Sequence, residues 1–288
     1  MATDTQNLTT SSTITDEQFQ AIVSFISDAL DAGGMNKTAD IGQVDPDTVT
    51  FPGSNNSEGG YEIRAFDDSL TGTAPVAIKL SYRRGSSAAQ FQLGVQIGSG
   101  SDGSGNITGE KLSQQNFNLV LSAMTSQPWD ICATENSFIL CGSYSSSQYR
   151  SVISLERTRN ASNEITDQGL MLVYKNVTDT FRSFYINYAA NSFINETTTA
   201  GGCMMPSNQT SGLHGSGDTA VYPYNVFGVG EVLVPPLNLV GGFSSNFSDV
   251  TTYTIGVFGQ SQTMKAIHTH GIARGGAGAN AIMLMKWI

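Results

Sequence analysis

The strongest constraint on the fold is a change in the spacing of apolar residues after Asp45-Pro46. Upstream, they recur at helical spacing, whereas downstream they occupy every second position, as in Val76–Tyr82 and Phe91–Ile97. A period of two places alternate side chains on one face of a strand. The Ser/Gly-containing turn Arg83–Ser87 separates these two runs. The segment therefore predicts a long hairpin with one buried and one solvated face.

Similar short runs, separated by Gly, Ser and Asn turns, continue to the end of the chain. Tyr61, Ile63 and Ala65 alternate upstream of the hairpin. The later strand-like runs are Asn116–Ala123, Phe138–Cys141, Ser151–Arg157, Leu170–Lys175, Phe181–Tyr188, Val221–Val229, Glu231–Val234, Thr252–Phe258, Met264–His268 and Ile282–Trp287. Many strands at this spacing predict a mainly β fold, an antiparallel β-sandwich or a jelly-roll-like barrel, rather than alternating βα units.

One N-terminal amphipathic helix is the exception. Thr15 and Gln18 form a capping-box pattern at its start, and Gly33-Gly34 ends it. The apolar residues between them fall on one stripe, which predicts a helix that docks either on its own domain or on a neighbouring subunit. The polar residues 1–14 before the helix are typical of a flexible or partner-bound arm.

These patterns divide the chain into four parts. Residues 1–44 are predicted to form the arm and helix, and residues 45–190 the main β domain. Residues 191–219 lose all periodicity and are predicted to be an irregular loop region. Residues 220–288 form a C-terminal β region, either separate or part of the same domain. Its last strand, Ile282–Trp287, is strongly apolar and must be paired within a sheet or an interface.

Composition excludes several classes of function. Only 13% of the residues are charged, about half the usual 25%, and the net charge is −10 with a pI near 4.6. A nucleic-acid-binding protein needs a basic stripe, which this chain lacks. The mean hydropathy of −0.11, without a long apolar run, argues against membrane insertion. The start MATDTQNLTT has no secretory-signal pattern, and three cysteines do not suggest a disulfide framework.

Candidate sites are few, and the sequence predicts no catalytic residue and no cofactor. His268 and His270 would face the same side of a strand, which makes them weak candidates for metal ligands. The loop Ser101–Asn106 loosely resembles a calcium loop, but it is more typical of a flexible hairpin tip. His214 lies near a Ser and an Asp without the separated segments of a catalytic triad. Nothing selects an acid–base pair among the carboxylates Glu62, Asp67, Asp68, Glu135 and Glu156.

Four segments together give the chain a family resemblance. These are the hairpin Ser81–Gly98, the loop Gly98–Gly109, the segment Leu155–Gly169 and the terminal strand Ile282–Trp287. Their sequence pattern resembles that of the β-rich virion proteins of tailed bacteriophages, which form tails, baseplates, necks and capsid decorations. The resemblance implies a protein made in the host cytoplasm that oligomerises on a particle. It transfers no functional residue to this chain.

From this resemblance we expect a non-enzymatic tail or baseplate protein of the virion, which forms a homo-oligomer and contacts other virion proteins. We further expect deletion of residues 1–14 to weaken assembly and leave the fold intact. The alternative is a capsid decoration protein or an adhesin that binds a host-surface glycan. The aromatic residues available for sugar binding beside polar loops are Tyr144, Tyr149, Tyr222 and Tyr224.

Overall fold

The computed structural model describes residues 1–143, 150–160, 162, 164–175, 180–189, 192–198, 203–204, 221–223, 225–227, 233–234, 239–243, 251–257, 260–268 and 281–287. In these ranges the chain forms one helix, α1 (Asp16–Gly33), and strands in five sheets. The strands are β1 (Ala2–Thr10), β2 (Glu58–Ala65), β3 (Ala77–Arg84), β4 (Phe91–Gly98), β5 (Gly100–Ser101), β6 (Ile107–Thr108), β7 (Leu112–Val120), β8 (Met124–Thr134), β9 (Ser137–Ser143), β10 (Arg150–Arg159), β11 (Ile165–Lys175), β12 (Thr180–Asn187), β13 (Ser192–Thr198), β14 (Cys203–Met204), β15 (Val221–Pro223), β16 (Asn225–Phe227), β17 (Leu233–Val234), β18 (Leu239–Phe243), β19 (Thr252–Val257), β20 (Gln260–His268) and β21 (Ala281–Lys286).

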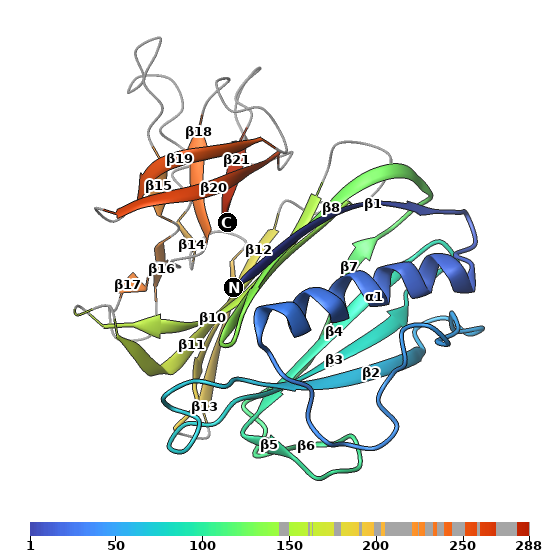
Figure 1. Ribbon diagram of the computed structural model, residues 1–288, viewed down its shortest axis with the longest axis horizontal. Coiled ribbons are helices and arrows are strands. Elements are labelled where there is room, and N and C mark those ends of the chain that lie inside the picture. Colours follow the sequence, from blue (N-terminus) through green and yellow to red (C-terminus); the bar gives the residue numbers. More distant parts are fainter. Residues whose placement is uncertain are drawn as a thin grey trace.

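Two antiparallel sheets form the main sandwich (Figure 1). The large sheet has seven strands in the order β1-β8-β9-β10-β11-β12-β13, and the small sheet has four in the order β2-β3-β4-β7. Apart from β1, neighbours in each sheet follow one another closely in sequence, so both are meanders rather than the Greek-key crossings of a jelly roll. The predicted mainly β fold, an antiparallel sandwich with an N-terminal amphipathic helix, is confirmed.

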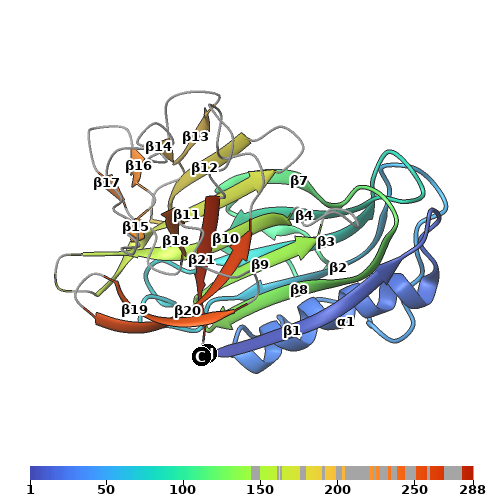
Figure 2. The same cartoon turned by 90° about the horizontal axis from the view of Figure 1, so that it is seen from above.

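Helix α1 lies along the open side of the sandwich, between the two sheets (Figures 1 and 2). Thr15 caps it in a complete capping box with Gln18, and Gly34 ends it in the left-handed conformation with φ 87°. Gly33 lies so close to β8 that a Cβ would come within 2.7 Å of the Ala133 backbone. Half of the helix residues are buried. The helix therefore docks on its own domain, which was one of the two predicted outcomes.

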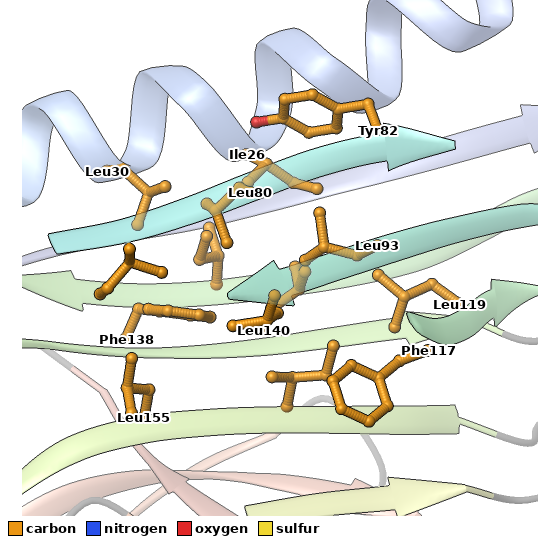
Figure 3. Close-up of a cluster of buried hydrophobic side chains, with 14 of the residues drawn as sticks. Ile26, Leu30, Leu80, Tyr82, Leu93, Phe117, Leu119, Phe138, Leu140 and Leu155 are labelled. Atoms are coloured by element: carbon orange, nitrogen blue, oxygen red, sulfur yellow. The ribbon is translucent and has the colours of Figure 1, made fainter. Parts of the chain in front are cut away.

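The hydrophobic core fills the space between the sheets and the helix. Figure 3 shows that side chains from α1 and from both sheets of the sandwich meet there, namely Ile26, Leu30, Leu80, Tyr82, Leu93, Phe117, Leu119, Phe138, Leu140 and Leu155. Each of them is at most 2% exposed. Burying side chains of this size from water stabilises the fold by about 1.5–3 kcal/mol each. The alternating residues of the predicted hairpin, now β3 and β4, supply the small-sheet side of this core.

Three segments depart from the sequence-based expectation. Residues 2–10 were predicted to belong to a flexible or partner-bound arm, but they form the edge strand β1 of this chain's own large sheet, and Leu8 is only 3% exposed. The strand was not predicted because an edge strand buries few of its side chains, so the sequence of β1 is mostly polar and lacks an apolar alternation. Strand β8 was not predicted because Pro128 and Asp130 interrupt its apolar pattern. Within the predicted irregular region 191–219, residues 192–198 form β13, which pairs with β12.

A C-terminal sheet in the order β15-β18-β21-β20-β19 forms the third layer. Its apolar last strand β21 lies between β18 and β20, so the predicted need for a pairing partner is met inside this chain. Figure 1 shows this sheet on the face of the large sheet that is turned away from α1. Among the described residues, no helix is both long enough and apolar enough to cross a membrane.

Candidate functional site: buried charge clusters that join distant segments

The most unusual feature of the interior is a carboxylate that joins four separate strands. Asp130 of β8 is fully buried, and it accepts hydrogen bonds from Arg150 Nη1 at 2.6 Å and Lys265 Nζ at 2.5 Å. The Thr5 hydroxyl of β1 donates to Asp130 Oδ1 at 2.7 Å and accepts from Lys265 Nζ at 2.6 Å. We call these four residues the Asp130 junction. It connects the N-terminal strand, the large sheet and the C-terminal sheet at one point.

Lys265 reaches the junction from the C-terminal sheet. Its ammonium group also lies 4.2 Å from the centre of the Trp287 ring, a cation–π contact. Met264, Ala266, Ile267 and Met285 beside it are fully buried. Ile267 and Met285 lie on the same face of the C-terminal sheet as Lys265, so this face combines apolar side chains with the charged contact to Asp130.

A second cluster lies under α1. Arg64 of β2 is fully buried, and its Nη2 donates to Glu62 Oε2 at 2.8 Å and to Ser27 Oγ at 2.9 Å. Its Nη1 contacts Asp31 and donates to the Met35 carbonyl at 2.9 Å. This arrangement fastens the C-terminal half of the helix to the small sheet. Glu62 and Arg64 therefore lie on the face of β2 that is turned towards α1, and Ile63, on the opposite face, is fully buried as well.

Tyr82 completes this cluster from β3, where its hydroxyl donates to Glu62 Oε1 at 2.6 Å. Burial, followed by the negative charge of Glu62, raises the pKa of Tyr82 well above its usual value. The tyrosine is therefore a neutral donor to a buried carboxylate.

We expect Tyr82→Phe to lower the free energy of unfolding by about 1.5–3 kcal/mol, because Glu62 loses a charge-assisted hydrogen bond without a change in ring packing. Denaturant unfolding of the variant measures this. Tyr61→Phe is the control, since the Tyr61 hydroxyl bonds the Ile41 carbonyl in an exposed position. Equal effects of the two substitutions would contradict the role given to Glu62.

A third cluster fixes the loop that follows β2. Arg157 of β10 donates from Nε to Asp68 Oδ2 at 2.6 Å and from Nη2 to the Ala74 carbonyl at 2.8 Å. Its guanidinium group lies 5.2 Å from the Tyr188 ring centre and 5.5 Å from that of Phe66. Arg157 thus holds the connection between β2 and β3 against the large sheet.

These clusters account for several carboxylates considered as acid–base candidates. Glu62 and Asp68 are held in the buried pairs just described. Asp67 donates its backbone N–H to the Glu135 carbonyl, which joins two loops through the main chain. Glu156 is buried in β10.

The loop considered as a calcium site closes on itself. Asp102 accepts hydrogen bonds from the Ser104 and Asn106 amides and from Asn106 Nδ2, which together lower the pKa of its carboxyl group. The β5–β6 hairpin that carries this loop also docks on Asp40. Burial by itself would raise the pKa of Asp40, but bonds from Ser101, Thr38 and the Gly105 amide lower it. The segment is the tip of a hairpin, as predicted, but hydrogen bonds to Asp40 and Asp102 anchor it, so the predicted flexibility is wrong.

The two histidines proposed as weak metal ligands are only partly described. His268 is the last residue of β20, with its backbone opposite Ile282. His270 and His214 lie outside the described residues, as do Tyr144, Tyr149 and Tyr224, whereas Tyr222 lies in β15. Across the described ranges, no group of three or more His, Cys, Asp or Glu side chains is placed to hold a metal ion.

Two of the three cysteines are buried thiols on adjacent strands of the large sheet. Cys132 and Cys141 are not joined in a disulfide. Burial raises the pKa of Cys132 to about 11, which keeps it protonated at neutral pH. It is therefore a poor nucleophile in the folded protein.

We expect Cys132 to resist iodoacetamide in the native protein at pH 8 and to react rapidly after denaturation. The cause is the raised thiol pKa, because the thiolate is the reactive form. Peptide mass spectrometry of native and denatured samples measures the labelled fraction. Since the folded pKa is raised, the stability contributed by the neutral thiol is full below the unfolded pKa and falls as pH rises towards 11. Similar labelling of the two samples would refute this assignment.

The outer face of the small sheet carries a group of uncharged amides on β4 and β7, beside Lys79 and Arg83 of β3. Gln92 Nε2 donates to Asn118 Oδ1 at 2.7 Å across β4 and β7, and Gln114 Nε2 donates to Asn116 Oδ1 at 2.9 Å along β7. Gly94 lies beneath them, and a Cβ there would come within 2.8 Å of Asn116 Oδ1. The glycine thus gives these side chains room to lie flat. We call Gln92, Gln114, Asn116 and Asn118 the amide face.

The sequence reasoning missed the Asp130 junction and the Arg64 cluster. A signal for the second was present, because Glu62 and Arg64 alternate in a predicted strand. The first has no local signal, since its members are far apart in sequence. Compared with known proteins, the chain matches no family model, no curated protein and no solved structure.

Proposed function

We propose that this chain is a structural subunit of a tailed-bacteriophage virion, from the tail or baseplate, without a catalytic role. In the virion it forms homo-oligomers by repeated contacts and touches other virion proteins. The observation that carries the proposal is how its buried charges are used. Asp130 and Asp68 each pair with an arginine or lysine from another strand, and Glu62 lies 3.4 Å from Lys37 of the segment that follows α1.

Such pairs fix the relative positions of the layers and do no chemistry on a substrate. A particle subunit needs this property, because contacts repeated under symmetry require a rigid and reproducible shape. The scarcity of charged residues at 13% also fits, since long charged side chains lose conformational entropy when contacts order them.

Electron microscopy of the purified assembly tests the proposal. Three-fold or six-fold rings are the expected result for a tail or baseplate part. Three-fold knobs on a shell would instead assign the chain to capsid decoration. A monomer at every concentration tested would refute the proposal.

The amide face favours a second function, that of an adhesin for a host-surface glycan. Asn and Gln side chains both donate and accept hydrogen bonds, as sugar hydroxyls do. A glycan array with the wild-type protein, and with Asn116→Ala as the variant, tests this function. We expect the variant to lose the bound glycans. Binding that persists unchanged in the variant would exclude the amide face as the glycan site.

A further inference from the structure

The outer edge of β1 has no pairing partner in the described structure. β1 is the first strand of the large sheet, and only β8 pairs with it. The Thr5 amide donates to the Asp4 carboxylate at 2.8 Å, which shows that it points away from β8. In an antiparallel pair, alternate residues point the same way, so the amides of Thr3, Thr5 and Asn7 lie on the open side.

This edge lacks the usual protection against strand addition. β1 contains no Pro, Lys or Arg, Asp4 is its one charged residue, and its register with β8 is unbroken from Ala2 to Leu8. The four residues Asp4–Asn7 are exposed. The corresponding edge of the small sheet is covered, because Thr38, Gln43 and Val44 bond along β2. Natural proteins normally blunt a long open edge by such means.

Helix α1 limits what can bind there. Figures 1 and 2 agree that α1 runs beside β1 on the same open side of the sandwich. Paired strands lie about 4.8 Å apart, whereas packed helices need about 8–10 Å. Two copies that joined β1 to β1 would place two helices with acidic and no basic residues next to each other, and this like charge disfavours the pairing. A single extended segment needs only the narrower spacing.

The charge of the side chains near the open edge of β1 indicates which kind of segment would bind there. The exposed charged residues of α1 are Asp16, Glu17, Asp28 and Asp31, and the helix contains no basic residue. Asp16 accepts a hydrogen bond from the Phe51 amide and Asp31 pairs with Arg64, both on the small-sheet side of the helix. Glu17 and Asp28, with Asp4 of β1, are therefore the acidic side chains available to a segment at the open edge. An incoming strand with Lys or Arg at alternate positions would be complementary to them.

This chain is a poor source of such a segment. It has 14 Lys and Arg residues in total. The residues with another cation within four positions are Lys79, Arg83, Arg84, Arg157 and Arg159, and all of them belong to the paired strands β3 and β10. The occupant must therefore come from another protein.

We propose that the outer edge of β1, together with the exposed side chains of Glu17 and Asp28 in α1, is a docking surface for an extended basic segment of a different protein. The segment adds to the large sheet as a further strand, and its backbone pairs with Thr3, Thr5 and Asn7. This inference goes beyond the proposed function, because it concerns the isolated protein whether or not that protein belongs to a virion.

The test uses a synthetic peptide of alternating Thr and Lys, about ten residues long to match a strand, and an equal peptide of alternating Thr and Glu. Hydrogen exchange followed by NMR gives the site of binding. We expect the Lys peptide to slow exchange at Thr3, Thr5 and Asn7, and the Glu peptide to have no effect. A Glu17→Gln, Asp28→Asn double variant should weaken binding about threefold or more, in line with exposed ion pairs.

The matched variants are Asn7→Pro and Asn7→Ala. Proline removes an outward amide, which an edge strand tolerates, so Asn7→Pro should abolish peptide binding and Asn7→Ala should retain it. If Asn7→Pro fails to fold, the double variant still decides the outcome. Equal slowing by both peptides, or slowing elsewhere than on β1, would overturn the proposal. Protection of the same amides by self-association of the protein would overturn it as well.

Discussion

Deletion of residues 1–14 is expected to remove most of the stability of the fold. The structure replaces the sequence-based expectation that the truncated protein folds normally. Leu8 and Ile14 are at most 3% exposed, and truncating a single buried residue of this kind costs about 2–5 kcal/mol. The deletion removes both, together with one of the two strands that pair with β8 and the Thr5 hydroxyl of the Asp130 junction. Since a domain is stable by about 5–15 kcal/mol, the result is a largely unfolded protein.

Circular dichroism and thermal unfolding of the truncated protein measure this effect. The double substitution Leu8→Ala, Ile14→Ala keeps the strand and separates lost burial from lost pairing, and it should still destabilise by several kcal/mol, on the order of two core truncations. Gln6→Ala is the control, because Gln6 is exposed in the same strand. A truncated protein with the wild-type melting temperature would show that β1 is not needed for the fold.

Asp130→Asn is expected to destabilise the protein by about 3–5 kcal/mol and to loosen the C-terminal sheet. The physical reason is that the change leaves two buried cations, Arg150 and Lys265, without their carboxylate. The side-chain volume hardly changes, so a packing defect does not explain the loss. Denaturant unfolding gives the free energy, and limited proteolysis shows whether residues after 220 become sensitive first.

Lys265→Met is the matched comparison. It removes one cation and leaves Asp130 paired with Arg150 at 2.6 Å, so a smaller loss, below about 1.5 kcal/mol, is expected for an apolar replacement. Proteolysis in the C-terminal sheet should still increase, because the contact with Thr5 is lost as well. If both variants lost the same stability, the uncompensated charge would not be the cause.

The two predictions concern the same point in the molecule. Thr5 and Lys265 are at opposite ends of the chain, and both contact Asp130 in the middle. Loss of the N-terminal strand therefore also weakens the attachment of the C-terminal sheet. In the proposed virion subunit, this coupling would let the layers reach their final positions together.

Local pattern was enough to predict much of the fold. The capping box at Thr15 and Gln18 and the stop at Gly33-Gly34 gave the bounds of α1 to within one residue, because helix ends are set by adjacent backbone groups. The strands β3 and β4 followed from their alternation. Such features depend only on residues close in sequence.

The candidate site was harder to predict from the sequence. The alternation of Tyr61, Ile63 and Ala65 gives β2 one apolar face, yet it is the polar face with Glu62 and Arg64 that lies against α1, because the helix supplies Ser27 and Asp31 as partners for the arginine. A buried charge is stable only when its partners are in place, and those partners come from another element. Alternation alone does not reveal which face lies against the helix.

The sequence by itself determined the class of the fold, its helix and most of its strands, since hydrophobic period and capping are local properties. The tertiary structure decided that residues 2–10 are part of a sheet, which face of β2 lies against α1, and that Asp130 joins the two ends of the chain. The reason is physical. Edge pairing and buried ion pairs are formed between segments that are distant in sequence, so their free energy exists only after the chain has brought them together.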